Sequence, residues 1–206
     1  MAYFPFFIDL DGKKGLIAGG GSVALRKVEK LLPYGPTLTV VAPVICPELT
    51  CISGVNFKLR PFSPTDLDGA SFVIAATDDP VLNRSIAQLC QQSGIPVNAV
   101  DDKDACTFLF PALVQQGSLC VGISTGGASP SAAIWLKNQI DALLPANLDC
   151  ILMWLEEQRP RVKNILPDEA ARSQLFTTLF SACLKKGDTL SEDEFQTILK
   201  QEDRNL

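Results

Sequence analysis

A cluster of carboxylates is the group of side chains in this sequence best suited to acid–base chemistry. Asp101, Asp102 and Asp104 directly follow the apolar run at residues 96–100, and the chain contains no histidine among its 206 residues. Proton transfer must therefore fall to Asp, Glu, Lys, Tyr or Cys. Because like charges and burial both raise the proton affinity of a carboxylate, we predict that Asp101 is a buried general base. The alternative is a solvated acidic loop, which is the stronger interpretation for Asp102 and Asp104.

A glycine-rich turn near the beginning of the chain has the spacing of a dinucleotide-binding loop, Gly-x-Gly-x-x-Ala. It stands between an apolar run at residues 16–18 and a stretch with helical apolar spacing. The small residues allow a tight turn, close approach of a pyrophosphate and close packing of helix on strand, and the helix start offers free N–H groups. A glycine turn without a ligand is the alternative. The predicted coenzyme contacts are Gly19, Gly21, Ser22, Val23 and Ala24.

The second predicted strand, residues 38–42, ends without the side chains that usually choose between coenzymes. No Asp or Glu is placed to hold the ribose hydroxyls, and no Arg is placed to hold a 2′-phosphate. We expect backbone groups near Pro43 and Val44 to take this place. The motif alone leaves the choice between NAD and NADP open.

Further strands and helices are needed to position these groups. Residues 57–62, 72–76 and 96–100 are predicted strands of a parallel sheet with helices on both faces, and Asp78 is expected to cap the helix that ends at Gly94. This arrangement places the carboxylate cluster at the carboxyl end of a strand, where open α/β sheets bind their ligands.

The pattern changes after about residue 106. Residues 107–114 and 119–124 predict a β-hairpin, and a turn at residues 124–127 leads into a helix of about 13 residues. Residues from 147 onward are predicted helical, with a capping box at Ser191 and Glu194. The turn is a second candidate anion cradle, with a plain hairpin-to-helix connection as the alternative. We predict domains at 1–113, 114–146 and 147–206.

Charge and cysteine content restrict the partners of this chain. The 18 Lys and Arg against 23 Asp and Glu leave a net charge of −5, which argues against a general nucleic-acid binder. No run approaches the roughly 18 apolar residues of a membrane span. Seven cysteines lack C-x-x-C or metal-finger spacing, and no export signal precedes them. We expect reduced, mostly buried thiols in a cytoplasmic protein without a bound metal, nucleic-acid partner or membrane partner.

The predicted middle segment has few charges. Residues 114–146 carry only Lys137 and Asp141, which indicates a buried subunit contact. Cys106, Cys120, Trp135 and Trp154 are expected to be packing residues rather than ligands, nucleophiles or substrate platforms.

Four motifs in order resemble the precorrin-2 dehydrogenase family, which includes the N-terminal module of siroheme synthase. They begin at Gly19, Ala75, Val97 and Ser124, with the sequences GGGSVALRK, AATDD, VNAVD and STGGASP. The resemblance implies an α/β fold with an N-terminal Rossmann-like parallel sheet, a central strand-exchanged dimerisation region and a C-terminal helical domain. The resemblance also implies that the protein is a homodimer.

The resemblance also implies an activity, the oxidation of precorrin-2 to sirohydrochlorin with NAD⁺. Some members also insert Fe²⁺ into sirohydrochlorin. The alternatives are therefore a bifunctional enzyme, an enzyme that only inserts Fe²⁺, and a non-catalytic NAD-sensing module. Asp101, in Asn-x-x-Asp, is the carboxylate implied for both reactions. Arg84, Lys103 and Lys137 are candidate cations for the substrate carboxylates, or else ordinary surface charges. The implied coenzyme contact is Thr77, and the implied substrate contacts are Asn98, Ser124, Thr125 and Gly126.

Overall fold

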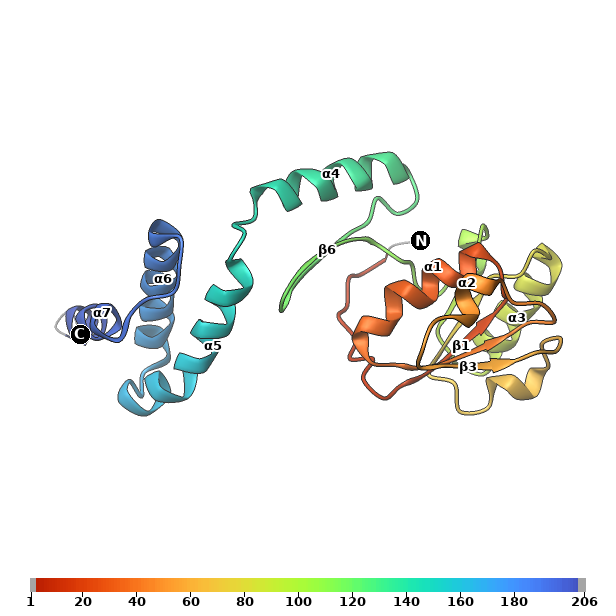
Figure 1. Cartoon of the computed structure of the whole chain (residues 1–206), viewed down its shortest axis with the longest axis horizontal. Coiled ribbons are helices and arrows are strands. Elements are labelled where there is room, and N and C mark those ends of the chain that lie inside the picture. The colour runs from red at the N-terminus through yellow and green to blue at the C-terminus, as the bar shows by residue number, and fades with distance from the viewer. Residues whose placement is uncertain (1–2, 204–206) are drawn as a thin grey trace. The chain divides into compact units, whose positions relative to one another are not determined.

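The apolar runs of the first hundred residues form a parallel sheet of five strands in the order β3-β2-β1-β4-β5 (Figure 1). The computed structural model describes residues 3–203. In this order the direction of strand addition reverses between β1 and β4, which opens a crevice at the carboxyl ends of these two strands. The strands are β1 (Lys14–Ala18), β2 (Thr37–Val41), β3 (Val55–Lys58), β4 (Phe72–Ala75) and β5 (Val97–Ala99).

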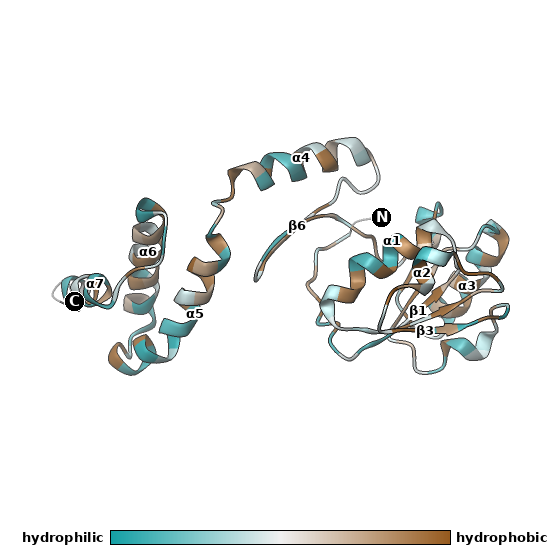
Figure 2. Ribbon diagram, in the orientation of Figure 1, coloured by the Kyte–Doolittle hydropathy of each residue, from teal (hydrophilic) through white to brown (hydrophobic). Residues whose placement is uncertain are grey.

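Helices cover both faces of this sheet because successive strand residues point to opposite sides. On one face, Ile17 of β1 packs with Ala24 and Val28 of α1 (Ser22–Leu31) and with the short α2 (Pro47–Thr50). On the other face, Leu16 packs with Ile86 of α3 (Pro80–Gln92). Figure 2 shows the result, with apolar strands and two-toned helices. Strands β1, β4 and β5 are therefore buried on both faces, as their unbroken apolar runs predict.

Asp79 caps helix α3, so the prediction that Asp78 is the cap is wrong. The Asp79 carboxylate accepts the N–H groups of Val81 at 2.8 Å and Leu82 at 3.2 Å. Pro80 occupies the first helical position, which makes the residue directly before it the cap. Three short 3-10 turns complete this part of the chain, η1 (Leu32–Tyr34), η2 (Pro64–Leu67) and η3 (Lys103–Ala105).

The rest of the chain holds a hairpin and four helices. Strands β6 (Ala112–Gln116) and β7 (Leu119–Ile123) pair antiparallel, and α4 (Pro130–Leu143) follows. Helices α5 (Leu148–Ile165), α6 (Glu169–Lys186) and α7 (Glu192–Asp203) share a separate apolar core. The capping box is confirmed, since Ser191 N–H donates to Glu194 at 2.7 Å and Glu194 N–H donates back to the Ser191 hydroxyl at 3.3 Å. Within residues 3–203, no helix is long and apolar enough to cross a membrane.

The chain divides into two compact units, Met1–Phe110 and Pro111–Leu206. The hairpin begins at Ala112, later than the expected residue 107, because η3 and the segment after it still pack on the first unit. The other predicted boundary, at residue 147, falls inside the second unit between α4 and α5. The division into three domains stays a prediction.

The expectation that most thiols are buried is wrong. Only Cys90, Cys106 and Cys183 of the seven thiols are buried. Trp135 is 61% exposed on α4, where Ala133 is the only buried residue. Trp154 does pack as expected, with its ring edge-on to Phe195 at 6.1 Å between centroids. The exposed tryptophan marks an apolar surface that this chain alone does not cover.

A cluster of one buried carboxylate and two partly exposed cations fixes the loop after β3. The Asp66 side chain is only 1% exposed and accepts hydrogen bonds from Lys58 at 2.7 Å, from Arg60 at 2.5 and 2.8 Å, and from the N–H of Ser63 at 2.9 Å. These donors, Arg60 first, hold the pKa of Asp66 well below its usual range. A carboxylate this enclosed is stabilised only while its charge is paired.

Replacing Asp66 by Asn should lower the free energy of unfolding by about 2 kcal/mol at pH 7, because hydrogen bonds to a charged group are lost. The difference from wild type should shrink as the pH falls below about 4, since the unfolded carboxylate then takes up a proton that the folded one refuses. Urea unfolding at several pH values measures this. Asp68→Asn, an exposed neighbour, is the control, and a pH-independent difference would contradict the role of the charge.

Candidate functional site

The glycine turn lies at the crevice between β1 and β4, and its three glycines have different reasons to be glycine. Gly19 has a φ of +124°, and a Cβ there would collide with the backbone oxygen of Ala76. A Cβ on Gly20 would collide with the backbone oxygen of Val44. At Gly21, by contrast, a Cβ would meet nothing within 4 Å. Two glycines serve internal packing, and the third leaves open space.

The start of helix α1 faces this open space. Gly21 is its N-cap and no side chain caps it, so the first-turn N–H groups at Ser22, Val23 and Ala24 have no intrahelical acceptor. Ala24 is fully buried against the sheet, which lets the helix lie close to β1. An open glycine cradle at an uncapped helix start fits the diphosphate of a dinucleotide coenzyme. The predicted contacts thus lie together in one loop.

Gly20 was missed by the sequence analysis, although it joins this loop to the one after β2. Its carbonyl accepts the N–H of Cys46 at 2.8 Å, and Gly19 N–H donates to Val41 at 2.9 Å. Pro43 and Val44, the predicted ribose contacts, therefore lie beside the glycine turn. The Val44 side chain is 79% exposed. Gly20 occupies the variable position of Gly-x-Gly, and its need to be glycine comes from a contact with Val44 that the sequence alone does not reveal.

Asn83 is a second residue that the sequence analysis missed. It is 3% exposed and fixes the loop after β4, since its Oδ1 accepts from the N–H of Thr77 at 3.0 Å and from the Thr77 hydroxyl at 2.7 Å. Its Nδ2 donates to the carbonyl of Thr77 at 3.0 Å. This loop carries Ala76, against which Gly19 packs. Asn83 therefore holds one wall of the crevice through Thr77, the predicted coenzyme contact.

A cleft of about 880 Å³ extends from Thr77 to the carboxylate cluster. It lies between the first half of α3 and the segment after β5, at the carboxyl edge of the sheet. This volume is in the range of small-molecule sites. Its lining includes Asn83, Arg84, Asp101, Asp102 and Lys103. The structure thus brings the predicted base and a predicted coenzyme contact into one cleft.

Asp101 is exposed, so the expectation that it is buried is wrong. Its φ of +60° makes it the only non-glycine residue of residues 3–203 with a positive φ. The left-handed region is uncommon for non-glycine residues, and strained residues of this kind collect at functional sites. The carboxylate is open to the cleft, as a base that meets a substrate must be.

Asp102 has a separate role from Asp101. Its Oδ2 accepts from Arg84 Nε at 2.8 Å and pairs with Arg84 Nη2 at 2.6 Å, and its Oδ1 accepts the Ala105 N–H at 3.2 Å. The Arg84 guanidinium holds the pKa of Asp102 below its usual range. The interpretation of Asp102 as a solvated loop residue is therefore wrong. Arg84, a candidate substrate cation, is already paired with a carboxylate.

Asn98 lies in β5 with its side chain turned into the protein. It is 6% exposed, and its Nδ2 donates to the carbonyl of Phe108 at 3.0 Å while its Oδ1 accepts from Lys27 Nζ at 3.4 Å. Lys27 also lies 3.7 Å from the centroid of the Phe110 ring, and burial lowers its pKa to about 8. In this structure Asn98 connects α1 to the end of the first unit. Its assignment to the substrate stays a prediction.

The turn before α4 belongs to the second unit and satisfies its own polar groups. Thr125 Oγ accepts the N–H of Ser129 at 3.1 Å and donates to its carbonyl at 3.0 Å, and Gly126 N–H donates to the Ser124 hydroxyl at 3.2 Å. Ser129 caps the helix through Ala132 at 3.1 Å. The substrate role of this turn stays a prediction. Lys137, the third candidate cation, is half-buried on α4.

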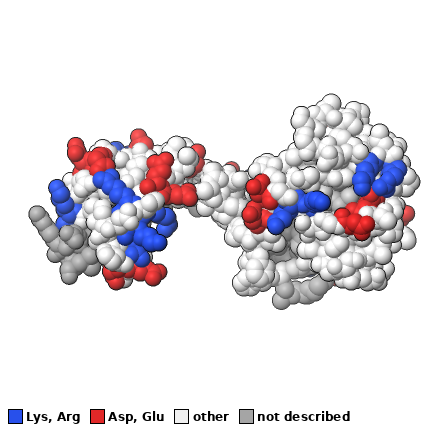
Figure 3. Space-filling view, turned by 90° about the horizontal axis from the view of Figure 1, so that it is seen from below, with Lys and Arg blue, Asp and Glu red and all other residues white. Residues whose placement is uncertain are grey.

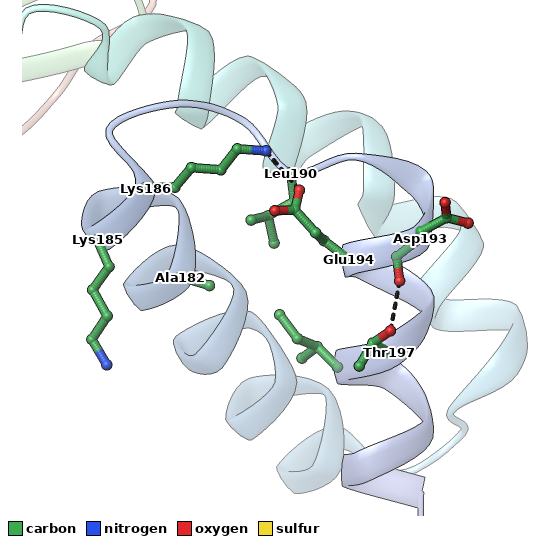
Figure 4. Close-up of a pocket in the computed structure, with 8 residues that line it drawn as sticks. Ala182, Lys185, Lys186, Leu190, Asp193, Glu194 and Thr197 are labelled. Carbon is green, nitrogen blue, oxygen red and sulfur yellow. Dashed lines mark hydrogen bonds and ion pairs between the residues drawn. The ribbon is translucent and has the colours of Figure 1, made fainter.

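A shallow hollow of about 530 Å³ between α6 and α7 contains none of the predicted site residues (Figure 4). The ion pair of Lys186 and Glu194, 2.6 Å apart, lies at its edge. Among the side chains that the structure describes, residues 3–201, no group of three or more His, Cys, Asp and Glu could hold a metal ion. On the face shown in Figure 3, basic and acidic side chains alternate instead of forming one basic surface.

Known proteins are similar to this chain over most of its length. A siroheme synthase of Thioalkalivibrio sulfidiphilus is 38% identical over 182 residues, which are 87% of this chain and 37% of that protein. Siroheme synthase 1 of Aeromonas salmonicida is 36% identical over 211 residues, 98% of this chain and 45% of that protein. The chain thus spans roughly two fifths of the length of these relatives.

The fold also matches a solved structure. The chain named "SirC, precorrin-2 dehydrogenase" aligns with a TM-score of 0.73 and 23% identity, covering 98% of this chain and 100% of that one. Residues 6–112, which hold the glycine turn, the cleft and Asp101, match a family described as putative NAD(P)-binding. The chain therefore belongs to this putative NAD(P)-binding family.

Proposed function

We propose that this chain is a cytoplasmic, NAD-dependent precorrin-2 dehydrogenase that produces sirohydrochlorin for siroheme synthesis. The observation that carries the proposal is the cleft in which the exposed carboxylate of Asp101 and the loop of Thr77 lie at one sheet edge. The names of the relatives, siroheme synthase and precorrin-2 dehydrogenase, support the substrate. The free state of all seven cysteines suits a reducing compartment.

We assign coenzyme binding and proton transfer to different residues of this chain. The N–H groups of Ser22 and Val23 would bind the coenzyme diphosphate above Gly21, and backbone groups at Pro43 and Val44 would lie near a ribose. When bound, NAD⁺ accepts two electrons and one proton as hydride. Asp101 would accept the second proton that leaves the substrate, which balances the oxidation. No histidine is needed for either transfer.

Substrate carboxylates have to find donors other than Arg84, because that side chain is paired with Asp102. Lys103 lines the cleft. We assign the remaining contacts to Asn98 and to Ser124, Thr125 and Gly126, with Lys137 as a further cation. Fe²⁺ would enter as a substrate, with the tetrapyrrole nitrogens as its ligands and Asp101 as the base.

The first part of the second unit, residues 112–143, supports a homodimer as the working form. Its sheet has only two strands, and of their residues only Val114 is buried. Two-stranded sheets are marginally stable alone, and exposed edge strands pair readily with other chains. On α4, Ile134, Trp135 and Leu143 are 55%, 61% and 81% exposed. A second copy, through exchanged strands, would cover both features.

Replacing Asp101 by Asn should lower kcat for anaerobic NADH formation from precorrin-2 by about 100-fold or more, because the general base is lost. The Kd for NAD⁺ should stay within about twofold, since the glycine turn is unchanged. Asp68→Asn, exposed in the same unit, is the control.

Three outcomes of that assay would contradict the proposal. Wild-type protein that forms no NADH is not a dehydrogenase. A variant that forms NADH as fast as wild type would show that Asp101 is not the base of the reaction. Insertion of added Fe²⁺ into sirohydrochlorin without any NAD⁺-dependent step would indicate a chelatase alone.

Replacing Gly21 by Val should weaken NAD⁺ binding at least tenfold in calorimetry, because the new side chain enters the open space above α1. Its melting temperature should fall only slightly, since a Cβ at Gly21 meets nothing within 4 Å and only the N-cap of α1 is weakened. Gly20→Val is the matched variant, which should destabilise the fold by crowding Val44. Unchanged NAD⁺ affinity in Gly21→Val would mean that the coenzyme does not occupy this turn.

Replacing Trp135 by Glu should convert the dimer to monomer at micromolar concentration, because a charge would be buried in the proposed contact. Sedimentation equilibrium measures the mass. Met153→Glu, at a 57% exposed apolar position on α5, is the control and should remain dimeric. A monomeric wild type would overturn the assignment.

A further inference from the structure

The conformation of Asp101 needs an explanation that the residue itself does not supply. Its φ of +60° is strained for a non-glycine residue, and its side chain is exposed. Such a conformation persists only where the surrounding structure imposes it. The constraint must therefore come from the residues on either side.

On the amino-terminal side, strand β5 fixes the backbone. Ala99 pairs with Ala75 of β4, and Val100 N–H donates to the carbonyl of Ala75 at 2.9 Å. The strand ends at Ala99, so Asp101 stands two residues beyond the last paired position.

On the carboxyl-terminal side, Asp102 is anchored at both carboxylate oxygens. One oxygen binds Arg84 of α3, at 2.6 and 2.8 Å, and the other accepts the N–H of Ala105 at 3.2 Å. The Asp102 side chain is only 18% exposed, although that of Arg84 is 66% exposed. The anchor therefore ties the segment after Asp101 to a helix that is itself packed on the sheet.

The thiol of Cys106 closes the same loop from within. Its Sγ lies 3.1 Å from the carbonyl oxygen of Ala99 and 3.2 Å from that of Asp102. The segment from Ala99 to Cys106 is thus held at its start, its middle and its end. Asp101 is the residue that must turn between two fixed points.

We propose that Arg84 and Asp102 form a positioning clamp, which holds Asp101 in its left-handed conformation and directs its carboxylate into the cleft. This inference rests on the proposed role of Asp101 as the base. It differs from a substrate-binding role for Arg84, which would leave Asp102 without a function in turnover.

The two roles predict different kinetics. A clamp acts on the geometry of the reacting carboxylate, and a misplacement of about 1 Å can cost roughly 100-fold in rate. Arg84→Ala and Asp102→Asn should each lower kcat by about 10- to 100-fold with KM within twofold. The double variant should be no slower than the slower single variant, because both substitutions break one interaction. Arg84→Lys, which keeps a cation, should recover part of the loss.

A second measurement tests the clamp without any turnover. Hydrogen–deuterium exchange of residues 100–106 should become at least tenfold faster in Arg84→Ala and in Asp102→Asn. Arg161→Ala removes a comparable pair, with Glu192 at 2.5 Å in the second unit, and should change neither kcat nor exchange in this segment.

The results separate this inference from the proposed function. Unchanged exchange in both variants would overturn the clamp, whatever the activity. A raised KM with unchanged kcat in Arg84→Ala would make Arg84 a substrate contact instead. If wild type forms no NADH while exchange rises as expected, the dehydrogenase assignment fails and the clamp on Asp101 stands.

Discussion

The contact on which the site depends is the close approach of two parallel backbones, β1 and β4, at the reversal point of the sheet. Gly19, leaving β1, lies so close to the carbonyl of Ala76, leaving β4, that no side chain fits between them. This close approach brings the turn before α1 next to the Thr77 loop. The buried side-chain amide of Asn83 holds that loop by hydrogen bonds to the backbone of Thr77. Gly19 and Gly20 are thus packed against neighbouring backbone, whereas Gly21 faces open space.

Much of this arrangement could be predicted from the sequence, because it rests on local patterns. The apolar runs predict four of the five strands near their observed bounds, and Gly-x-Gly-x-x-Ala between a strand and a helix predicts the loop. The strand predicted at residues 57–62 is misplaced, since β3 covers Val55–Lys58 and shares only residues 57 and 58 with it. Ser191 and Glu194 form their capping box as expected. These signals come from residues close together in the chain.

Other features depend on contacts between distant residues, which one sequence does not display. Asn83 looks like an ordinary polar helix residue until it meets Thr77, and Gly20 looks like a variable position until it meets Val44. The error at Asp101 has the same origin, because adjacent carboxylates suggested a shared buried environment. Arg84, 18 positions before Asp102 in the sequence, instead separates the two carboxylates into an anchored one and an exposed one.

The distribution of thiols has a practical consequence for work with this protein. Cys51 and Cys150 are the exposed thiols, one in each unit. Burial raises the pKa of Cys90 to about 11, and the charge of Asp149 raises the pKa of Cys150. Since thiolates are the reactive form, maleimide dyes at neutral pH should attach preferentially at Cys51. A fluorophore there would follow the coenzyme-binding unit without any engineered cysteine.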